Sequence, residues 1–292
     1  MEIFGAQFIN SIALGSIYAL LVTGFNLLLV VGGIFQFAYP HIVVMSMYVC
    51  WLVLERTGGN VFLGILAAIG SGVGMSLATE PMFRPLAKRG ATLASFIVSL
   101  AIAMIIVDVM SRFLNWGLPI AFPVALSGGG GALVRYGIAT ITAGQLATIV
   151  GSISAVAGFL YLLYRTRQGR AFRVMAQDPF VARLLGIPIT RTSMSSYIIA
   201  GLLGGISAIF LAMAIGSASA PLADTLAMKV LAVALFAGLG NLRGGLIAAY
   251  ILGLAEGMTL AYLPGDWVNA IAFGMIIVVV MIRPQGLFGM RA

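Results

Sequence analysis

The stretch FQFAYPHIVVM, residues 35–45, gathers the side chains best suited to meet a polar solute. It holds Gln36, Tyr39 and His41, and His41 is the single histidine of the 292-residue chain. An amide, a phenol and an imidazole donate and accept hydrogen bonds without a strong fixed charge. Pro40 has no N–H and interrupts a helix that would run through it. The stretch is therefore a candidate binding site built on a helix break.

The sequence lacks the residue patterns that metal binding, nucleotide binding or hydrolysis would require. The single cysteine, Cys50, excludes an intrachain disulfide, and with one histidine it argues against a zinc cluster. Lys88 precedes Arg89 and Lys229 precedes Val230, so neither completes the Gly-Lys-Ser/Thr of a phosphate-binding loop. No serine stands in a nucleophile elbow. We expect no enzyme activity and no cofactor in this chain.

The composition requires lipid as the solvent. Hydrophobic residues make up 61% of the chain and charged residues 8%, against about 25% charged in soluble proteins. The apolar runs are continuous over about 20 residues, the length of a spanning helix, and do not alternate as barrel strands do. This predicts an all-α polytopic membrane protein. The net charge of +8 is then expected in cytoplasmic loops, and we expect no nucleic-acid partner.

A helix break is obligatory in the first quarter of the chain. Residues 3–54 carry no charge, and as one helix they would extend about 78 Å, far beyond a hydrocarbon core of about 30 Å. The chain must cross twice and turn, at Gly32-Gly33 or at Pro40. Hydropathy predicts nine crossings, within a range of about 8–10. The predicted spans are 6–30, 34–54, 61–80, 92–114, 141–164, 193–215, 225–240, 244–262 and 266–283. The short 225–240 segment is expected to be broken or re-entrant, and residues 1–292 are expected to form one transmembrane domain.

Basic residues predict the orientation. If the loop around 83–91 is cytoplasmic, twelve of the 16 lysines and arginines fall on that side. The other four fall on or near the outer side: Arg56, Arg112, Arg135 and Lys229. Because lysine and arginine concentrate in cytoplasmic loops, the C-terminus is predicted in the cytoplasm and the N-terminus outside.

Glycines recur at a four-residue spacing that lets helix backbones approach closely. The pairs are Gly70/Gly74, Gly201/Gly205, Gly240/Gly244 and Gly253/Gly257. We interpret them as packing positions within one bundle, with a dimerisation face as the alternative.

Residues 165–191, RTRQGRAFRVMAQDPFVARLLGIPITR, form the longest and most basic predicted cytoplasmic loop. The pattern predicts short helices over 169–176 and 179–185, with Asp178 as the N-cap before Pro179. Apolar side chains that a solvated loop does not need stand near its end: Leu184, Leu185 and Ile187. We interpret the loop as a docking segment for a partner; a loop that binds anionic lipid headgroups is the alternative.

Five segments, in order along nearly the whole chain, resemble the permease subunits of branched-chain amino-acid ABC importers, in particular the LivH-like subunit. They are LGSIYALLVTG (14–24), FRPLAKRG (83–90), GRAFRVMAQDPFVARLLGI (169–187), KVLAVALFAGLGNLRGGLIAAYILGLAEG (229–257) and RPQGLFG (283–289). The resemblance implies an importer of the bacterial inner membrane with five parts. Two related permease chains form the pore, and the family favours a sister chain over a second copy as the partner. Two cytoplasmic ATPases hold ATP and Mg²⁺, and a periplasmic or extracellular binding protein delivers the substrate.

By this resemblance the 165–191 loop is the segment that couples the permease to an ATPase. The implied coupling residues are Gly169, Arg170, Arg173, Ala176, Gln177, Asp178, Leu184, Leu185 and Gly186. The chain would form the translocation path for branched-chain or related amino acids, or another small polar solute, by alternating access. A stand-alone secondary transporter or channel is the alternative.

The opening stretch departs from the family pattern. Members commonly carry Asn-Phe-Ala-His-Gly there, whereas residues 36–40 read QFAYP and the histidine follows one place later. Because members handle branched-chain amino acids, urea, short amides and aromatic acids, the resemblance leaves the substrate open. The predicted pathway residues are Gln36, Phe37, Tyr39, Pro40, His41 and Asp108. For Gln36 and His41, hydrogen bonding between packed helices is the alternative.

Two acidic residues stand inside predicted spans, where ionisable groups often mark a pathway. Asp108 precedes Arg112 by one helical turn, so an ion pair along the helix is the alternative to a role in transport. Glu256 lies near the predicted outer end of its span, where exposure at a vestibule and a functional role are both open.

Overall fold

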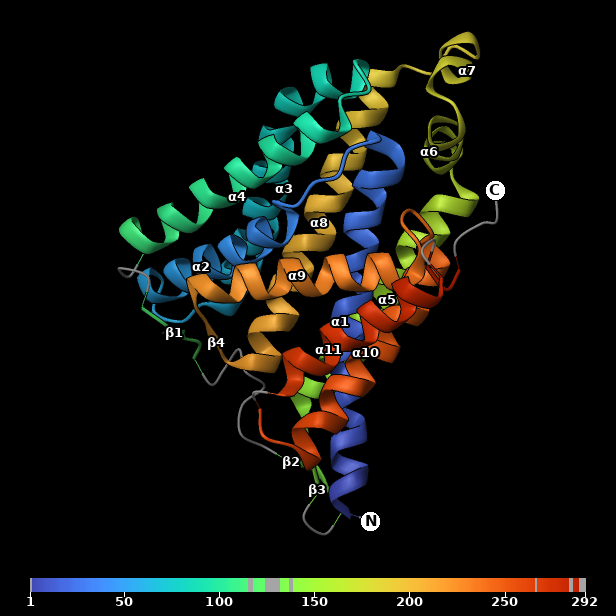
Figure 1. The fold of residues 1–292 in the computed structure, drawn as a ribbon. Helices are drawn as coiled ribbons and strands as arrows, with labels where there is room; N and C mark the ends of the chain where they lie inside the picture. Colours follow the sequence, from blue (N-terminus) through green and yellow to red (C-terminus); the bar gives the residue numbers. More distant parts are fainter. Residues whose placement is uncertain are drawn as a thin grey trace.

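The computed structural model describes residues 2–114, 118–123, 132–136, 139–265, 267–283 and 286–288. Most of this chain is helical (Figure 1). The long helices are α1 (Glu2–Gly32), α2 (Tyr39–Arg56), α3 (Val61–Lys88), α4 (Thr92–Phe113), α5 (Ala143–Arg165), α8 (Ile189–Ile215), α9 (Ala220–Ala237), α10 (Leu242–Tyr262) and α11 (Trp267–Ile282). Two short helices, α6 (Arg167–Gln177) and α7 (Pro179–Leu184), connect α5 to α8.

The predicted all-α polytopic fold is confirmed. In the described residues, seven helices are long and apolar enough to cross a membrane: α1, α3, α4, α5, α8, α9 and α10. The remaining two predicted spans correspond to α2, whose ends carry polar residues, and to α11, which has 16 residues. Of the two expectations for 225–240, the broken helix is wrong, and the re-entrant segment stays a prediction. Helix α9 begins earlier, at Ala220, with Pro221 in its first turn, where a missing N–H is tolerated, and it runs unbroken to Ala237.

Four short strands, which the sequence analysis did not predict, lie in the connections. β1 (Ile120–Ala121) pairs antiparallel with β4 (Ser217–Ala218). This pairing joins the α4–α5 connection to the α8–α9 connection. β2 (Ala132–Tyr136) and β3 (Ala139–Thr142) form an antiparallel pair close to the N-terminus (Figure 1). Helices α6 and α7 lie at the opposite end of the molecule.

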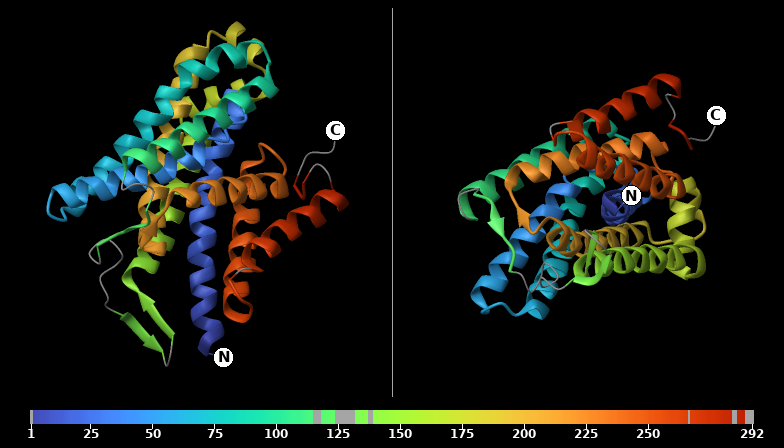
Figure 2. Two further views of the ribbon diagram at one scale, coloured as in Figure 1. Left: turned by 60° about the vertical axis from the view of Figure 1, so that its left-hand side comes forward. Right: turned by 90° about the horizontal axis from the view of Figure 1, so that it is seen from below.

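Helix α1 is the central element. It is apolar around its whole circumference, the pattern of a helix buried on every side. Its residues from Ile17 to Leu28 are buried almost without exception. Seen from below, α1 stands end-on inside a ring of the other helices (Figure 2). It packs most extensively against α10, then against α8 and α5.

Glycines permit close backbone contact in two helix pairs, α3 with α8 and α1 with α10. A Cβ added to Gly201 of α8 would come within 2.5 Å of the carbonyl oxygen of Gly72 in α3. A Cβ added to Gly253 of α10 would overlap the backbone of Gly15 in α1. The Gly201/Gly205 and Gly253/Gly257 pairs thus pack inside the bundle as predicted. The pair Gly70 and Gly74 does not, because no atom lies within 4 Å of an added Cβ at either position.

Candidate functional site

The candidate site begins where α1 ends. Helix α1 stops at Gly32, and Gly33 has φ +63°, a left-handed conformation that glycine adopts without strain. Residues 33–38 then turn back as a non-helical segment, after which α2 starts with Pro40 in its first turn (Figure 1). The predicted turn and helix break are confirmed, and they place His41 in the first turn of α2.

His41 reaches from α2 to α9. Its side chain is 1% exposed, and its Nε2 lies 3.1 Å from Oδ1 of Asp224, near the start of α9. Because a carboxylate only accepts hydrogen bonds, the imidazole donates through Nε2–H. The second ring nitrogen, Nδ1, has no partner among the described residues. Asp224 is 66% exposed, so the contact holds a carboxylate at the surface beside the start of α2.

A groove of about 370 Å³ opens beside this pair between α2, α4 and α9. Its polar lining is His41, Asp108, Ser111 and Asp224, and its apolar lining is Phe37, Leu100, Ala103, Met104 and Val107. Asp108 is 55% exposed and accepts a hydrogen bond of 2.7 Å from Nε of Arg112, so the ion pair along α4 is present. Two carboxylates beside an aliphatic wall suit a small molecule with an apolar body and a hydrogen-bond-donating or cationic end.

Three of the predicted pathway residues lie behind the groove. Gln36 is fully buried, and its Nε2 donates to Oγ1 of Thr79 in α3 at 3.0 Å. Tyr39 is also fully buried and donates to the carbonyl oxygen of Ala200 in α8 at 3.1 Å. Pro40 is buried as well. These residues fix the helix break against α3 and α8, whereas Phe37, His41 and Asp108 line the groove.

The predicted coupling residues form the two short helices α6 and α7. Thr166 caps α6 by accepting from the N–H of Gly169, which packs against the end of α5. Asp178 caps α7 by accepting from the N–H groups of Phe180 and Val181, as the sequence predicts. Gly169 is buried. The other predicted coupling residues are exposed: Arg170, Arg173, Ala176, Gln177, Asp178, Leu184, Leu185 and Gly186.

Helix α7 and the residue that follows it present an unusual apolar surface to solvent. Phe180, Leu184 and Leu185 are 66–73% exposed. Exposed apolar side chains gathered on one short helix are typical of a contact surface for another protein. Arg173 of α6 lies over the ring of Tyr164 in α5, 5.5 Å from its centre, which fixes α6 against the bundle.

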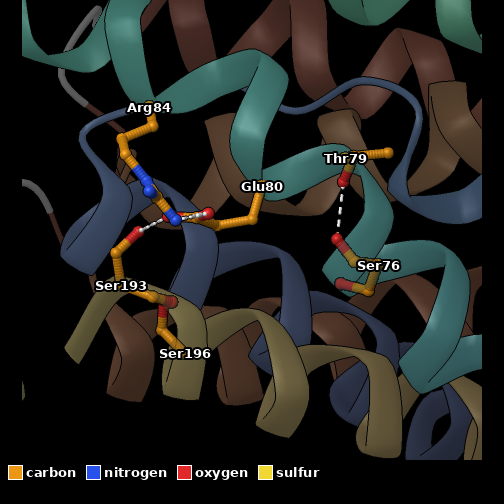
Figure 3. Close-up of polar contacts among 6 residues, drawn as sticks. All are labelled: Ser76, Thr79, Glu80, Arg84, Ser193 and Ser196. Atoms are coloured by element: carbon orange, nitrogen blue, oxygen red, sulfur yellow. Dashed lines mark hydrogen bonds and ion pairs between the residues drawn. The ribbon is translucent and has the colours of Figure 1, made fainter. Parts of the chain in front are cut away.

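Sequence reasoning missed Glu80, the acidic residue at the end of its predicted span. Glu80 is fully buried in α3, where its carboxylate pairs with Arg84 one turn later and accepts a hydrogen bond of 3.0 Å from Ser193 in α8. Figure 3 shows the Arg84 and Ser193 side chains converging on it. The four-residue spacing between Glu80 and Arg84 was the available signal.

A second buried cluster corrects the expectation for Glu256 and Lys229. Glu256 in α10 is 2% exposed, so it does not open onto a vestibule. Its Oε2 accepts from Nζ of Lys229 in α9 at 2.8 Å and from the hydroxyl of Tyr18 in α1 at 2.7 Å. Lys229, expected at the outer side, lies in the middle of α9 and is 11% exposed. The cluster joins three helices in the interior.

Spanning helices, a polar groove on their surface and an exposed pair of short helices at one end define a membrane permease subunit. A comparison with known protein families identifies the family of this subunit. The sequence model of the family described as "branched-chain amino acid transport system / permease component" matches residues 7–280. The chain belongs to this family and is a multi-pass permease subunit of an ABC importer. The family supports this function over the alternative, a stand-alone transporter or channel.

Curated relatives align over nearly their whole length. The high-affinity branched-chain amino acid permease protein LivH of Salmonella typhimurium is 24% identical over 98% of this chain and 96% of its own. BraD of Pseudomonas aeruginosa, with the same description, is 24% identical over 97% and 95%. A probable LivH of Methanocaldococcus jannaschii is 24% identical over 96% and 91%.

The fold also resembles a solved structure. A chain of "PsaBC from Streptococcus pneumoniae in complex with Fab" superposes with a TM-score of 0.52, covering 98% of this chain and 93% of that chain. The sequence identity is 12%, so this likeness concerns the fold alone.

Proposed function

We propose that the groove between α2, α4 and α9 is this chain's half of a translocation path for branched-chain or related amino acids. The names of the curated relatives support this substrate class. The chemistry of the groove supports it as well. The aliphatic wall suits the side chain of such an amino acid, and Asp108 and Asp224 suit its ammonium group. A volume of about 370 Å³ is near the lower limit of about 300 Å³ for small-molecule pockets.

The observation that carries the proposal is the exposure of charge beside an apolar surface. Asp108 is 55% and Asp224 66% exposed, while Met104, one turn from Asp108, is 73% exposed. Charged side chains within spanning helices rarely face lipid, and they usually face a water-filled cavity or another protein. This surface therefore faces the pore and the second permease, with Gln36, Tyr39 and Pro40 as its support.

The remaining parts of the machine follow from the family. A second permease, a sister chain, completes the pore, and a periplasmic or extracellular binding protein delivers the substrate. Two cytoplasmic ATPases bind ATP and Mg²⁺ and carry out the hydrolysis, which this chain does not. The exposed surface of α6 and α7 contacts one ATPase, and its movement drives alternating access. In this arrangement the chain lies in the bacterial inner membrane with its N-terminus outside and its C-terminus in the cytoplasm.

The substrate path is tested by amide variants of its carboxylates. In the reconstituted importer, Asp224→Asn and Asp108→Asn should each raise the KM for leucine uptake about tenfold or more, the loss expected for a charge-assisted hydrogen bond. Glu55→Gln is the matched control, because Glu55 is exposed at the end of α2 and lies outside this groove. Equal KM values for all three variants would place the path elsewhere.

The exposed surface of α6 and α7, which we call the coupling surface, is tested by replacing its leucines with alanine. Leu184→Ala with Leu185→Ala should reduce co-purification of the ATPases, whereas Leu239→Ala, an exposed leucine between α9 and α10, should not. Unchanged ATPase binding by the double variant contradicts the docking role.

The orientation in the membrane is tested by cysteine labelling. A cysteine introduced at Gly5 should react with an impermeant reagent added outside, and a cysteine introduced at Phe180 should not.

A further inference from the structure

A second cavity, of about 280 Å³, lies at the end of the molecule that carries α6 and α7. Its walls come from the ends of five helices: α1, α3, α6, α7 and α8. The apolar part includes Val31, Ile34, Met175 and Ile189. The groove described above shares no lining residue with it. The cavity is therefore a separate site, enclosed between the membrane helices and the coupling surface.

The polar lining is cationic and hydroxylic. It consists of Arg84, Arg183, Thr190, Ser193 and Tyr197, and no acidic residue is among the lining residues. The buried Glu80 is already bound to Arg84 and Ser193 (Figure 3). Arg183, in contrast, forms no ion pair with any residue that the structure describes. The cavity thus offers positive charge that the protein itself leaves free.

Tyr197 provides an independent observation that points to a ligand. The residue is 1% exposed and lines the cavity, yet its hydroxyl has no hydrogen-bond partner in the described part of the chain. A buried hydroxyl without a partner is unfavourable, and most such groups in native proteins are satisfied. A molecule in the cavity would supply the missing acceptor.

We propose that this cavity binds a small amphipathic anion, a carboxylate or phosphate attached to a short aliphatic group. The acidic group lies between Arg183 and the Tyr197 hydroxyl, and the aliphatic group packs on Val31, Ile34 and Met175. The volume is just below the usual lower limit of about 300 Å³ for small-molecule pockets, which limits the ligand to a few carbon atoms beyond its acidic group. A free short-chain acid and part of an anionic lipid share this chemistry.

The position of the cavity gives the ligand a regulatory effect, which rests on the proposed function. One wall is the end of α1 with Gly32 and Gly33, from which the chain leads directly to the groove at His41. Another part of the wall is Ala176 and Pro179, in the short helices α6 and α7 that carry the predicted coupling residues. A ligand that contacts both parts holds them together, and it therefore slows ATP hydrolysis that requires them to move.

Binding is tested on the assembled importer in nanodiscs of neutral lipid, with 4-methylpentanoate as the probe and thermal unfolding and calorimetry as the readouts. The wild-type complex should bind the probe and gain thermal stability. Arg183→Gln should weaken binding about tenfold, as expected for a lost charge-assisted hydrogen bond. The matched control is Arg191→Gln, which removes a charge eight residues away that does not line the cavity.

Tyr197→Phe separates a ligand contact from a structural role. Without ligand, removal of an unpartnered hydroxyl should leave the unfolding temperature unchanged or raised. With the probe, the variant should lose most of the stability that the wild type gains. Ala87→Leu, which fills the cavity from α3, should abolish probe binding while the chain still folds.

A second experiment, with an anionic lipid in the nanodiscs, distinguishes a free short-chain acid from a lipid as the ligand. If the complex is stabilised in nanodiscs with phosphatidylglycerol, in a manner that requires Arg183, but not by 4-methylpentanoate, the ligand is an anionic lipid. Absence of binding in both experiments, or equal weakening by Arg183→Gln and Arg191→Gln, overturns the proposal. Binding that leaves ATP hydrolysis unchanged overturns only the regulatory effect, and the uptake tests at Asp224 judge the proposed function separately.

Discussion

Replacing Lys229 with methionine tests whether the buried charges of α1, α9 and α10 stabilise the protein as a unit. The carboxylate of Glu256 is 2% exposed, and Lys229 is its sole cationic partner among the described residues. Removing the lysine leaves the hydroxyl of Tyr18, which cannot neutralise a charge. Breaking a buried ion pair from one side costs about 3–5 kcal/mol, a factor of roughly 10² to 10³ or more in the folded-to-unfolded ratio.

The matched experiment is a double-mutant cycle. Glu256→Gln alone leaves a buried lysine without a counter-ion, whereas Lys229→Met with Glu256→Gln removes both charges and keeps an acceptor for Tyr18. We expect the double variant to recover most of the stability, with a coupling energy of about 2 kcal/mol or more. Reversible unfolding of the purified subunit in SDS, followed by tryptophan fluorescence, measures all four proteins. Single effects below about 1 kcal/mol that add within about 0.5 kcal/mol would refute the reasoning.

Three further predictions concern other parts of the fold. Gly201→Ala should destabilise the subunit by about 1–3 kcal/mol in the same assay, because the added Cβ meets the α3 backbone, whereas Gly74→Ala, with open space around it, should not; equal effects would contradict the close contact. Glu80→Gln should cost about 2 kcal/mol through loss of the ion pair with Arg84, and a change below about 0.5 kcal/mol would show that the pair is unimportant. Cys50, which is 1% exposed, should resist maleimide in the folded protein and react after denaturation; rapid labelling of the native protein would contradict its burial.

The helices, the obligatory break and the cap of α7 could be predicted because each depends on local sequence. The break follows from the length of the uncharged segment 3–54, and the cap follows from Asp178 preceding a proline. Helix α9 starts five residues before the predicted span, because Pro221 lies in its first turn, where a proline does not interrupt a helix. Local patterns therefore gave the elements but not every boundary.

The side-chain contacts of the candidate site could not be predicted because they join distant helices. His41 and Asp224 are 183 positions apart, and Lys229 and Glu256 meet only because α9 packs on α10. The same limit applies to glycine. Gly74 and Gly201 belong to pairs with identical spacing, yet one faces outward and the other meets a helix, and only the packing distinguishes them.

The central position of α1 has a consequence for biosynthesis. Helix α1 leaves the ribosome well before α10, its most extensive partner, which begins 210 residues after α1 ends. At about 5–20 residues per second, α1 waits roughly 10–40 s before that partner exists. Its predominantly apolar sequence allows it to remain in lipid as a single helix until that partner is made. The later helices must then pack around α1, so truncated chains that end before α10 should leave Gly15 of α1, where Gly253 packs, uncovered.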